Sequence, residues 1–143
     1  MKKLAMLLVV VLFPTISFAA DSYLCVPDKS TGFHYYKETG KWDLAKFWTD
    51  EKYLFSKSET VNPTTKKPLI KWDLKEIGEE SSLFICFEDF SADGTIKCDG
   101  FEDKFIMNKN TLRFTLIYFY GYWDGVDNNL NNPAIVIGKC SPL

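Results

Sequence analysis

The stretch Thr111-Leu112-Arg113-Phe114-Thr115-Leu116-Ile117-Tyr118-Phe119-Tyr120 decides the class of fold. Successive side chains of a strand point to opposite faces, so Leu112, Phe114 and Leu116 share one face with Tyr118 and Tyr120. Arg113, Thr115, Ile117 and Phe119 share the other face. Both faces become apolar towards the end of the run. This pattern predicts a long central strand over 111–122 that is buried on both sides late in its course.

Short β-rich runs recur outward from this strand, separated by turn residues every eight to fifteen positions or so, which is typical of all-β domains. We predict an all-β fold, a small antiparallel barrel or sandwich of about 8 strands. The expected strands cover 23–26, 32–36, 41–47, 52–57, 69–77, 83–87, 94–98, 101–107, 111–122 and 134–140. Good helix formers leave a short helix open at 43–50 or 74–80.

The first residues predict export. Lys2 and Lys3 precede an apolar run over 4–13, and small residues stand at Ser17 and Ala19. This is the pattern of a signal peptide, and the run is too short to cross about 30 Å of hydrocarbon. We expect a cleaved signal peptide at 1–19 and a single β-rich domain at 20–143. That domain would carry no membrane anchor after cleavage, and would be periplasmic or secreted.

Export changes the interpretation of the four cysteines, because an even number in an oxidising compartment indicates disulfides. Cys86 and Cys98 flank a turn-rich stretch that resembles a hairpin, and Cys25 and Cys140 lie near the two ends of the mature chain. We predict the pairs Cys86–Cys98 and Cys25–Cys140. The cysteine spacing and the single histidine argue against zinc.

The charge is close to neutral, at −2 for 143 residues, and it becomes −4 once Lys2 and Lys3 leave with the signal peptide. This balance argues against a nucleic-acid partner. The aromatic content is high, with 12 Phe, 7 Tyr and 4 Trp. We expect the Phe residues to form the core. They include Phe33, Phe55, Phe84, Phe87, Phe105 and Phe114.

The sequence Lys-Trp-Asp-Leu occurs twice, at 41–44 and at 71–74. Tyr53-Leu54-Phe55 then aligns with Leu83-Phe84-Ile85. The recurrence predicts two related strand–turn–strand units, or it is a chance match of four residues.

The sequence contains little that indicates a catalytic site. His34 is the only histidine and has no nucleophile motif near it, so a strand histidine is the better interpretation. The acidic pairs Glu79-Glu80, Glu88-Asp89 and Glu102-Asp103 would suit a glycan hydrolase, but they fall where solvated charge at turns is expected. We predict no enzyme, cofactor or metal. Asp124–Asn129 is rich in oxygen ligands, but it lacks EF-hand spacing and reads as a plain loop.

The polar segment that runs from Asp124 to Pro133, with the aromatic residues before it, is the best candidate for a recognition loop. Trp and Tyr are common hot-spot residues in protein interfaces. The predicted binding residues are Tyr118, Tyr120, Tyr122, Trp123, Asp124, Asp127 and Trp42. Trp48 and Trp72 compete with these for a place in the site or in the core.

Thr39-Gly40-Lys41-Trp42 resembles the Gly-x-Trp signature of lipocalin-like and avidin-like barrels. The resemblance implies that Trp42 closes one end of a barrel and that Arg113, the only arginine, packs over it. The alternative is a hairpin turn with a left-handed glycine followed by an ordinary strand tryptophan.

Further segments together resemble a group of short, uncharacterised secreted proteins of proteobacteria and their phages. They are Tyr23–Cys25, Thr31–Phe33, Lys97–Phe101, Thr111–Phe114 and Ile137–Ser141. This resemblance implies the same export and disulfide plan, and it brings no catalytic residue or known activity. The overall shape is also similar to periplasmic lysozyme inhibitors, small disulfide-bonded barrels, although none of their loop motifs is present.

Three functions remain from these observations. The first is an exported non-enzymatic binding module that recognises a protein, a glycan or another cell-envelope component, with inhibition of a hydrolase as one form. The second is a lipocalin-like barrel around a small apolar ligand, which would require a deep cavity with Trp42 at its base. The third is a minor glycan hydrolase, which would require two carboxylates in a cleft.

Overall fold

The computed structural model describes residues 21–143, and the expected signal peptide at 1–19 lies outside the described residues. Every regular element in 21–143 is a strand, and this part of the chain has no helix long and apolar enough to cross a membrane. The strands are β1 (Ser22–Tyr36), β2 (Lys41–Lys46), β3 (Tyr53–Lys57), β4 (Trp72–Glu76), β5 (Phe84–Cys86), β6 (Thr95–Asp99), β7 (Lys104–Asn108), β8 (Arg113–Tyr118) and β9 (Ala134–Pro142).

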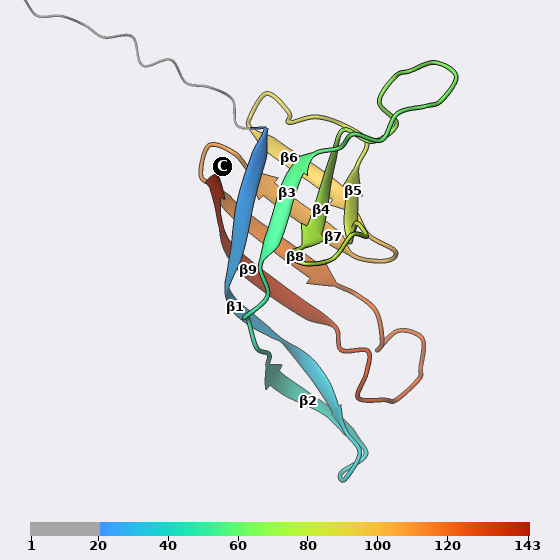
Figure 1. The fold of residues 1–143 in the computed structure, drawn as a ribbon. Coiled ribbons are helices and arrows are strands. Elements are labelled where there is room, and N and C mark those ends of the chain that lie inside the picture. The colour runs from blue at the N-terminus through green and yellow to red at the C-terminus, as the bar shows by residue number, and fades with distance from the viewer. Residues whose placement is uncertain (1–20) are drawn as a thin grey trace, which may run out of the picture.

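Eight of these strands form a closed antiparallel barrel. The order runs β1-β3-β4-β5-β6-β7-β8-β9, and β9 pairs back with β1 (Figure 1). Strand β2 pairs with β1 alone and lies outside the closed ring. The prediction of an all-β fold with about 8 strands is confirmed, and of the two architectures left open the barrel is correct.

Strand β1 is longer than expected, because the runs predicted at 23–26 and 32–36 are one strand. Its register against β9 shifts between Pro27 and Lys29, next to the residue that has no N–H to donate to the ladder. Beyond Gly32 the strand leaves the barrel and pairs only with β2. We call this projecting hairpin, residues 31–36 with β2, the arm; it extends away from the barrel in Figure 1.

Side chains fill the barrel interior. Phe55 lies among aromatic rings, with centroid distances of 5.1 Å to Trp72 and 5.0 Å to Phe105. The buried core consists of Tyr23, Cys25, Tyr53, Phe55, Trp72, Leu74, Phe84, Cys86, Ile96, Cys98, Phe105, Met107, Phe114, Leu116, Val136 and Cys140. The core assignment was wrong for two of the predicted phenylalanines, because Phe33 and Phe87 lie outside the barrel and are exposed.

Strand β8, the strand expected over 111–122, faces the core on one side only. Phe114 and Leu116 are buried as the alternation predicts. The expectation of burial on both sides was wrong: β8 ends at Tyr118, and Phe119 is 48% exposed. The physical reason is closure, because a small barrel has one interior and the outer face of each strand meets solvent.

Both predicted disulfides are confirmed. Cys25–Cys140 joins β1 to β9 where these strands close the barrel, and Cys86–Cys98 joins β5 to β6. No cysteine in 21–143 is left free. Two disulfides are typical of a protein that folds in an oxidising compartment.

The two ends of the barrel differ. The end from which the arm projects carries the loops 47–52, 77–83, 100–103 and 119–133, and we call it the arm end. The opposite end carries loops 58–71, 87–94 and 109–112 together with the C-terminus and the start of β1, and we call it the termini end (Figure 1).

Loop length sets an expected order for the two disulfides. In the chain-entropy model, the bond that spans 115 residues stabilises the fold by about 4–5 kcal/mol and the bond that spans 12 residues by about 3 kcal/mol. The double variant Cys25→Ala/Cys140→Ala should therefore lose more unfolding free energy than Cys86→Ala/Cys98→Ala. Urea denaturation of both variants tests this order, and a larger loss from the 86/98 pair would contradict it.

The termini end is held by Asp89, whose Oδ1 accepts hydrogen bonds from the Phe90 N–H (2.8 Å) and from Trp72 Nε1 (3.0 Å). The bond from the Phe90 backbone, and after it the one from Trp72, holds the pKa of Asp89 below its ordinary value. Trp72 is buried, so this carboxylate satisfies a donor that water does not reach.

A carboxyl with a lowered pKa stabilises the fold above its unfolded pKa of about 3.9, and this contribution is lost as the pH falls through the folded pKa. Asp89→Asn keeps an acceptor oxygen but cannot titrate. Its unfolding free energy should therefore fall less steeply below pH ~4 than that of the wild type. Urea titrations followed by tryptophan fluorescence at several pH values measure the slopes, with Glu88→Gln as the control. Parallel slopes for Asp89→Asn and the wild type would contradict the assignment.

Candidate functional site

The arm and the 119–133 loop hold each other in place. Trp42 on β2 donates a hydrogen bond from Nε1 to Asp127 Oδ1 over 2.7 Å. The Trp42 and Tyr122 rings also pack in a T-shaped arrangement, with centroids 5.6 Å apart. Three of the predicted binding residues, distant in sequence, therefore lie together at the arm end.

A second set of contacts joins the base of the arm to the end of the same loop. The Phe33 N–H donates to the Pro133 carbonyl over 2.9 Å, and His34 Nδ1 lies at a hydrogen-bonding distance of 3.0 Å from Asn132 Oδ1. Gly32 permits this approach, because a Cβ there would lie 2.1 Å from the Pro133 oxygen. The single histidine thus serves as a positioning contact for the loop.

The 119–133 loop also stabilises itself. Gly121 has a φ of 122°, and a Cβ there would lie 2.1 Å from the Asn131 oxygen, so the neck of the loop requires glycine. Asp124 Oδ1 accepts a hydrogen bond from the Val126 N–H. Since Asp124 and Asp127 each already accept a hydrogen bond, the interpretation of this segment as a structured loop accounts for both carboxylates.

The remaining predicted aromatic residues divide into two groups. Tyr122 is 65% exposed and Trp123 is 64% exposed, while Tyr120 packs edge-on against Trp123 with centroids 6.5 Å apart. Tyr118 instead forms a hydrogen bond with Tyr53 at the end of the core, and burial raises its pKa. Tyr118 therefore supports the site from below, and Tyr120, Tyr122 and Trp123 face solvent.

The roles implied by the Gly-x-Trp resemblance are not met. Trp42 lies on the arm, outside the closed barrel, and contacts Tyr35 and Tyr122. Arg113 begins β8 at the opposite end and is exposed. The alternative holds for this segment: Gly40 has a φ of 62° in the turn, and an ordinary strand tryptophan follows. Trp72 is in the core.

Exposed apolar side chains gather at the arm end. Each of its four loops presents at least one of them, and the arm adds more. They are Phe33, Tyr36, Leu44, Trp48, Ile77, Leu83, Phe101, Phe119, Tyr120, Tyr122, Trp123, Val126 and Leu130. Large exposed apolar patches on a stable scaffold mark binding surfaces. The sequence prediction missed Phe101 and Leu130, which are 94% and 83% exposed.

Charged side chains, like exposed apolar ones, are distributed differently between the loops of the two barrel ends. The four loops of the arm end carry eight acidic side chains and one basic side chain, Lys52. The loops of the termini end carry four of each sign. Each loop of the arm end combines exposed apolar side chains with two acidic ones, as in Trp48 with Asp50 and Glu51. The signal that could have revealed Phe101 is this repeated combination, because Glu102 and Asp103 follow it directly.

Three clefts open at this end. The first, of about 370 Å³, is lined by residues that include Trp48, Glu51 and Leu130, and the remaining two lie beside Phe101 and beside the arm. The one beside Phe101 has a volume of about 360 Å³ and is lined by Phe101, Glu102, Asp103, Tyr118, Tyr120, Leu130, Asn131 and Asn132. The other, of about 290 Å³, lies between the arm and the outer face of β8 and β9, and its walls are almost entirely apolar. Phe33 and Leu44 form its arm side, and Ile117, Phe119 and Ile135 form its barrel side.

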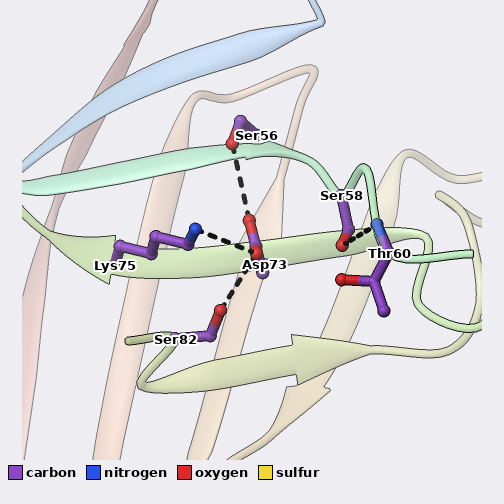
Figure 2. Close-up of polar contacts among 6 residues, drawn as sticks. All are labelled: Ser56, Ser58, Thr60, Asp73, Lys75 and Ser82. Atoms are coloured by element: carbon purple, nitrogen blue, oxygen red, sulfur yellow. Dashed lines mark hydrogen bonds and ion pairs between the residues drawn. The ribbon is translucent and has the colours of Figure 1, made fainter. Parts of the chain in front are cut away.

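Asp73 on β4 is the buried charged residue of the described chain, and its partners make it structural (Figure 2). Its carboxylate accepts hydrogen bonds from Ser82 Oγ (2.9 Å) and Ser56 Oγ (3.5 Å), and Lys75 Nζ lies 3.8 Å away. Ser82 belongs to the 77–83 loop, so the contact fixes that loop of the arm end to the barrel. The same four residues, Lys-Trp-Asp-Leu, place Asp43 on the exposed arm.

No protein-family model matches the chain, and a search of the curated proteins and of the solved structures finds no match either.

The contact between the arm and the loop can be tested through Asp127. Asp127→Ala removes the acceptor of the Trp42 Nε1–H and should loosen the 119–133 loop while leaving the barrel intact. Hydrogen exchange should accelerate in 121–131 and 41–43, with unchanged protection in β3 to β8. Asp124→Ala is the control for loss of a loop carboxylate without the Trp42 contact. Unchanged exchange at 41–43 in Asp127→Ala would contradict the coupling.

Proposed function

We propose that the protein is an exported, non-enzymatic binding protein that recognises a partner protein with its arm end. The observation that carries the proposal is the concentration of exposed Trp, Tyr, Phe and Leu side chains on the arm and on four loops of one rigid barrel end. Aromatic residues of this kind supply most of the affinity of protein interfaces.

The scaffold supports this interpretation. A disulfide-bonded barrel with a filled aromatic core holds its loops in fixed positions, so little ordering entropy is lost when a partner binds. Trp42, Tyr122 and Asp127 fix the arm against the 119–133 loop in the free protein. The disulfides also support a site of action outside the cytoplasm, in the periplasm or beyond the cell.

The filled core argues against the barrel that encloses a small apolar ligand. Phe55, Trp72 and Phe105 occupy the interior, and Trp42 lies outside it. An apolar ligand would have to use the cleft between the arm and β8–β9, which is open along one side of the barrel. That cleft suits an apolar side chain of a partner protein, as an anchor at the margin of the aromatic surface.

Retention experiments test the proposal. The mature protein is immobilised and exposed to periplasmic extract and to culture fluid, and retained proteins are identified by mass spectrometry. We expect one saturable partner, whose retention is lost for Trp123→Ala and for Tyr122→Ala. Phe87→Ala removes an aromatic side chain that is 58% exposed at the termini end, and it should retain the partner as the wild type does.

Thermal unfolding controls for damage to the fold, since both tyrosine and tryptophan changes are at exposed positions and should leave the midpoint within a few degrees. Retention that survives Trp123→Ala and Tyr122→Ala, or that is lost equally for Phe87→Ala, would contradict recognition by the arm end.

A further inference from the structure

We propose that the cleft beside Phe101 is a binding site for a cationic side chain, arginine or lysine, of the partner protein. The inference deepens the proposed function and rests on it only for the identity of the molecule that carries the cation.

The lining of the cleft combines aromatic and acidic side chains. Phe101, Tyr118 and Tyr120 supply aromatic surface, and Glu102 and Asp103 supply two carboxylates side by side in the sequence. Asp103 Oδ1 accepts a hydrogen bond of 2.9 Å from the Phe119 N–H, which fixes the orientation of this carboxylate. Carboxylates together with aromatic surface form the environment that binds organic cations.

Glu102 provides the second observation. Its Oε2 atom is shielded from solvent and has no hydrogen-bond partner, and no other buried side-chain nitrogen or oxygen atom in 21–143 is in this state. A carboxylate oxygen removed from water without a donor is unfavourable. Turn acids are normally solvated, so this one requires an explanation. Glu102 as a whole is only partly buried and lines the cleft, so a rotation of its carboxylate would bring this oxygen to a donor bound there.

The described chain offers no cation for this purpose. The ion pairs within 21–143 join Lys57 to Asp21, Lys75 to Asp73, and Lys104 to Asp99. Lys104 is the basic residue that follows the two acids directly, and its partner is Asp99. Glu102 and Asp103 therefore have no counter-ion of their own, and the charge of the cleft is available to a partner.

An organic cation fits the cleft better than a metal ion. Within 21–143 no group of three or more His, Cys, Asp or Glu side chains is arranged to hold a metal, and the cleft places aromatic rings beside its two carboxylates. A guanidinium group can bind a carboxylate through two hydrogen bonds and lie against a ring at the same time. We therefore expect arginine to bind more tightly than lysine.

The test uses acetyl-arginine amide, with acetyl-citrulline amide as the neutral probe of nearly the same shape. Both are titrated into the isotope-labelled mature protein while amide signals are followed by two-dimensional NMR. We expect saturable shifts at 101–103 and 118–120, with a dissociation constant on the order of millimolar and no shift at 87–94. Citrulline should produce no saturable shift. Equal responses to the two probes, or no response to arginine at tens of millimolar, would overturn the proposal.

Glu102→Gln separates a binding role from a structural one. The variant should bind acetyl-arginine amide about tenfold more weakly or worse, because a charge-assisted hydrogen bond is lost. Its thermal midpoint should equal or exceed that of the wild type, because an unpaired shielded charge is removed. Glu80→Gln, at an exposed acid of the neighbouring 77–83 loop, should change neither property. A lower midpoint with unchanged arginine binding in Glu102→Gln would assign Glu102 to the fold and overturn the proposal.

The two proposals fail separately. Shifts by arginine without any retained partner would leave the cation site intact and remove the support for protein recognition. A retained partner that Glu102→Gln binds as tightly as the wild type does would leave the proposed function intact and overturn the cation site.

Discussion

Pairing between β1 and β9 closes the sheet into a barrel, and the Cys25–Cys140 bond makes this closure covalent. Without that pairing both strands would expose an edge of unpaired backbone groups, and the aromatic core would open to solvent. The bond links residues 115 positions apart, so it restricts the unfolded chain more than any local contact does. The position of every loop at the arm end follows from this closure.

The arm forms because the pairing of β1 with β9 stops before β1 ends. β1 pairs with β9 as far as Gly32, and its remaining residues have no place in the ring, so they continue outward and pair with β2. An isolated hairpin is marginal in water. The contacts of Trp42 with Asp127 and of Phe33 with Pro133 compensate for this, and they order the 119–133 loop as well. Two segments that would each be mobile alone thus form one surface.

Alternation and turn residues were sufficient to predict most of the strands, because these are local patterns. The turn between Cys86 and Cys98 predicted one disulfide, and the two remaining cysteines near the ends of the mature chain gave the other. The two Lys-Trp-Asp-Leu segments show where such patterns end. Leu74 is 0% exposed in the core, whereas Leu44, at the same place in the other copy, is 70% exposed on the arm. Which copy lies inside depends on long-range strand pairing, which a tetrapeptide does not carry. The same limit explains the two strands expected around Pro27 and the burial expected for Phe119.

The site was predictable in part for a related reason. Tyr120, Tyr122 and Trp123 stand out because large aromatic residues precede a polar loop, but Phe101 is a single residue in a four-residue turn. Its relation to Tyr118 and Tyr120 arises only when β7 and β8 pair. Glu102 resembled a solvated turn acid for the same reason. The cleft that it lines includes residues distant in sequence, and hydrophobic periodicity contains no information about them.

The distribution of charge changes the meaning of the near-neutral composition. A net charge of −2 argues against a large basic face, yet it conceals an arm end whose loops carry eight acids and one base. Complementary charge mainly selects the partner and accelerates its approach, while buried aromatic contacts determine how slowly it leaves. At the arm end, every loop carries both acidic side chains and exposed apolar side chains. In the binding role proposed above, a partner that pairs with the carboxylates would also be placed against the rings, so one surface would supply both specificity and affinity.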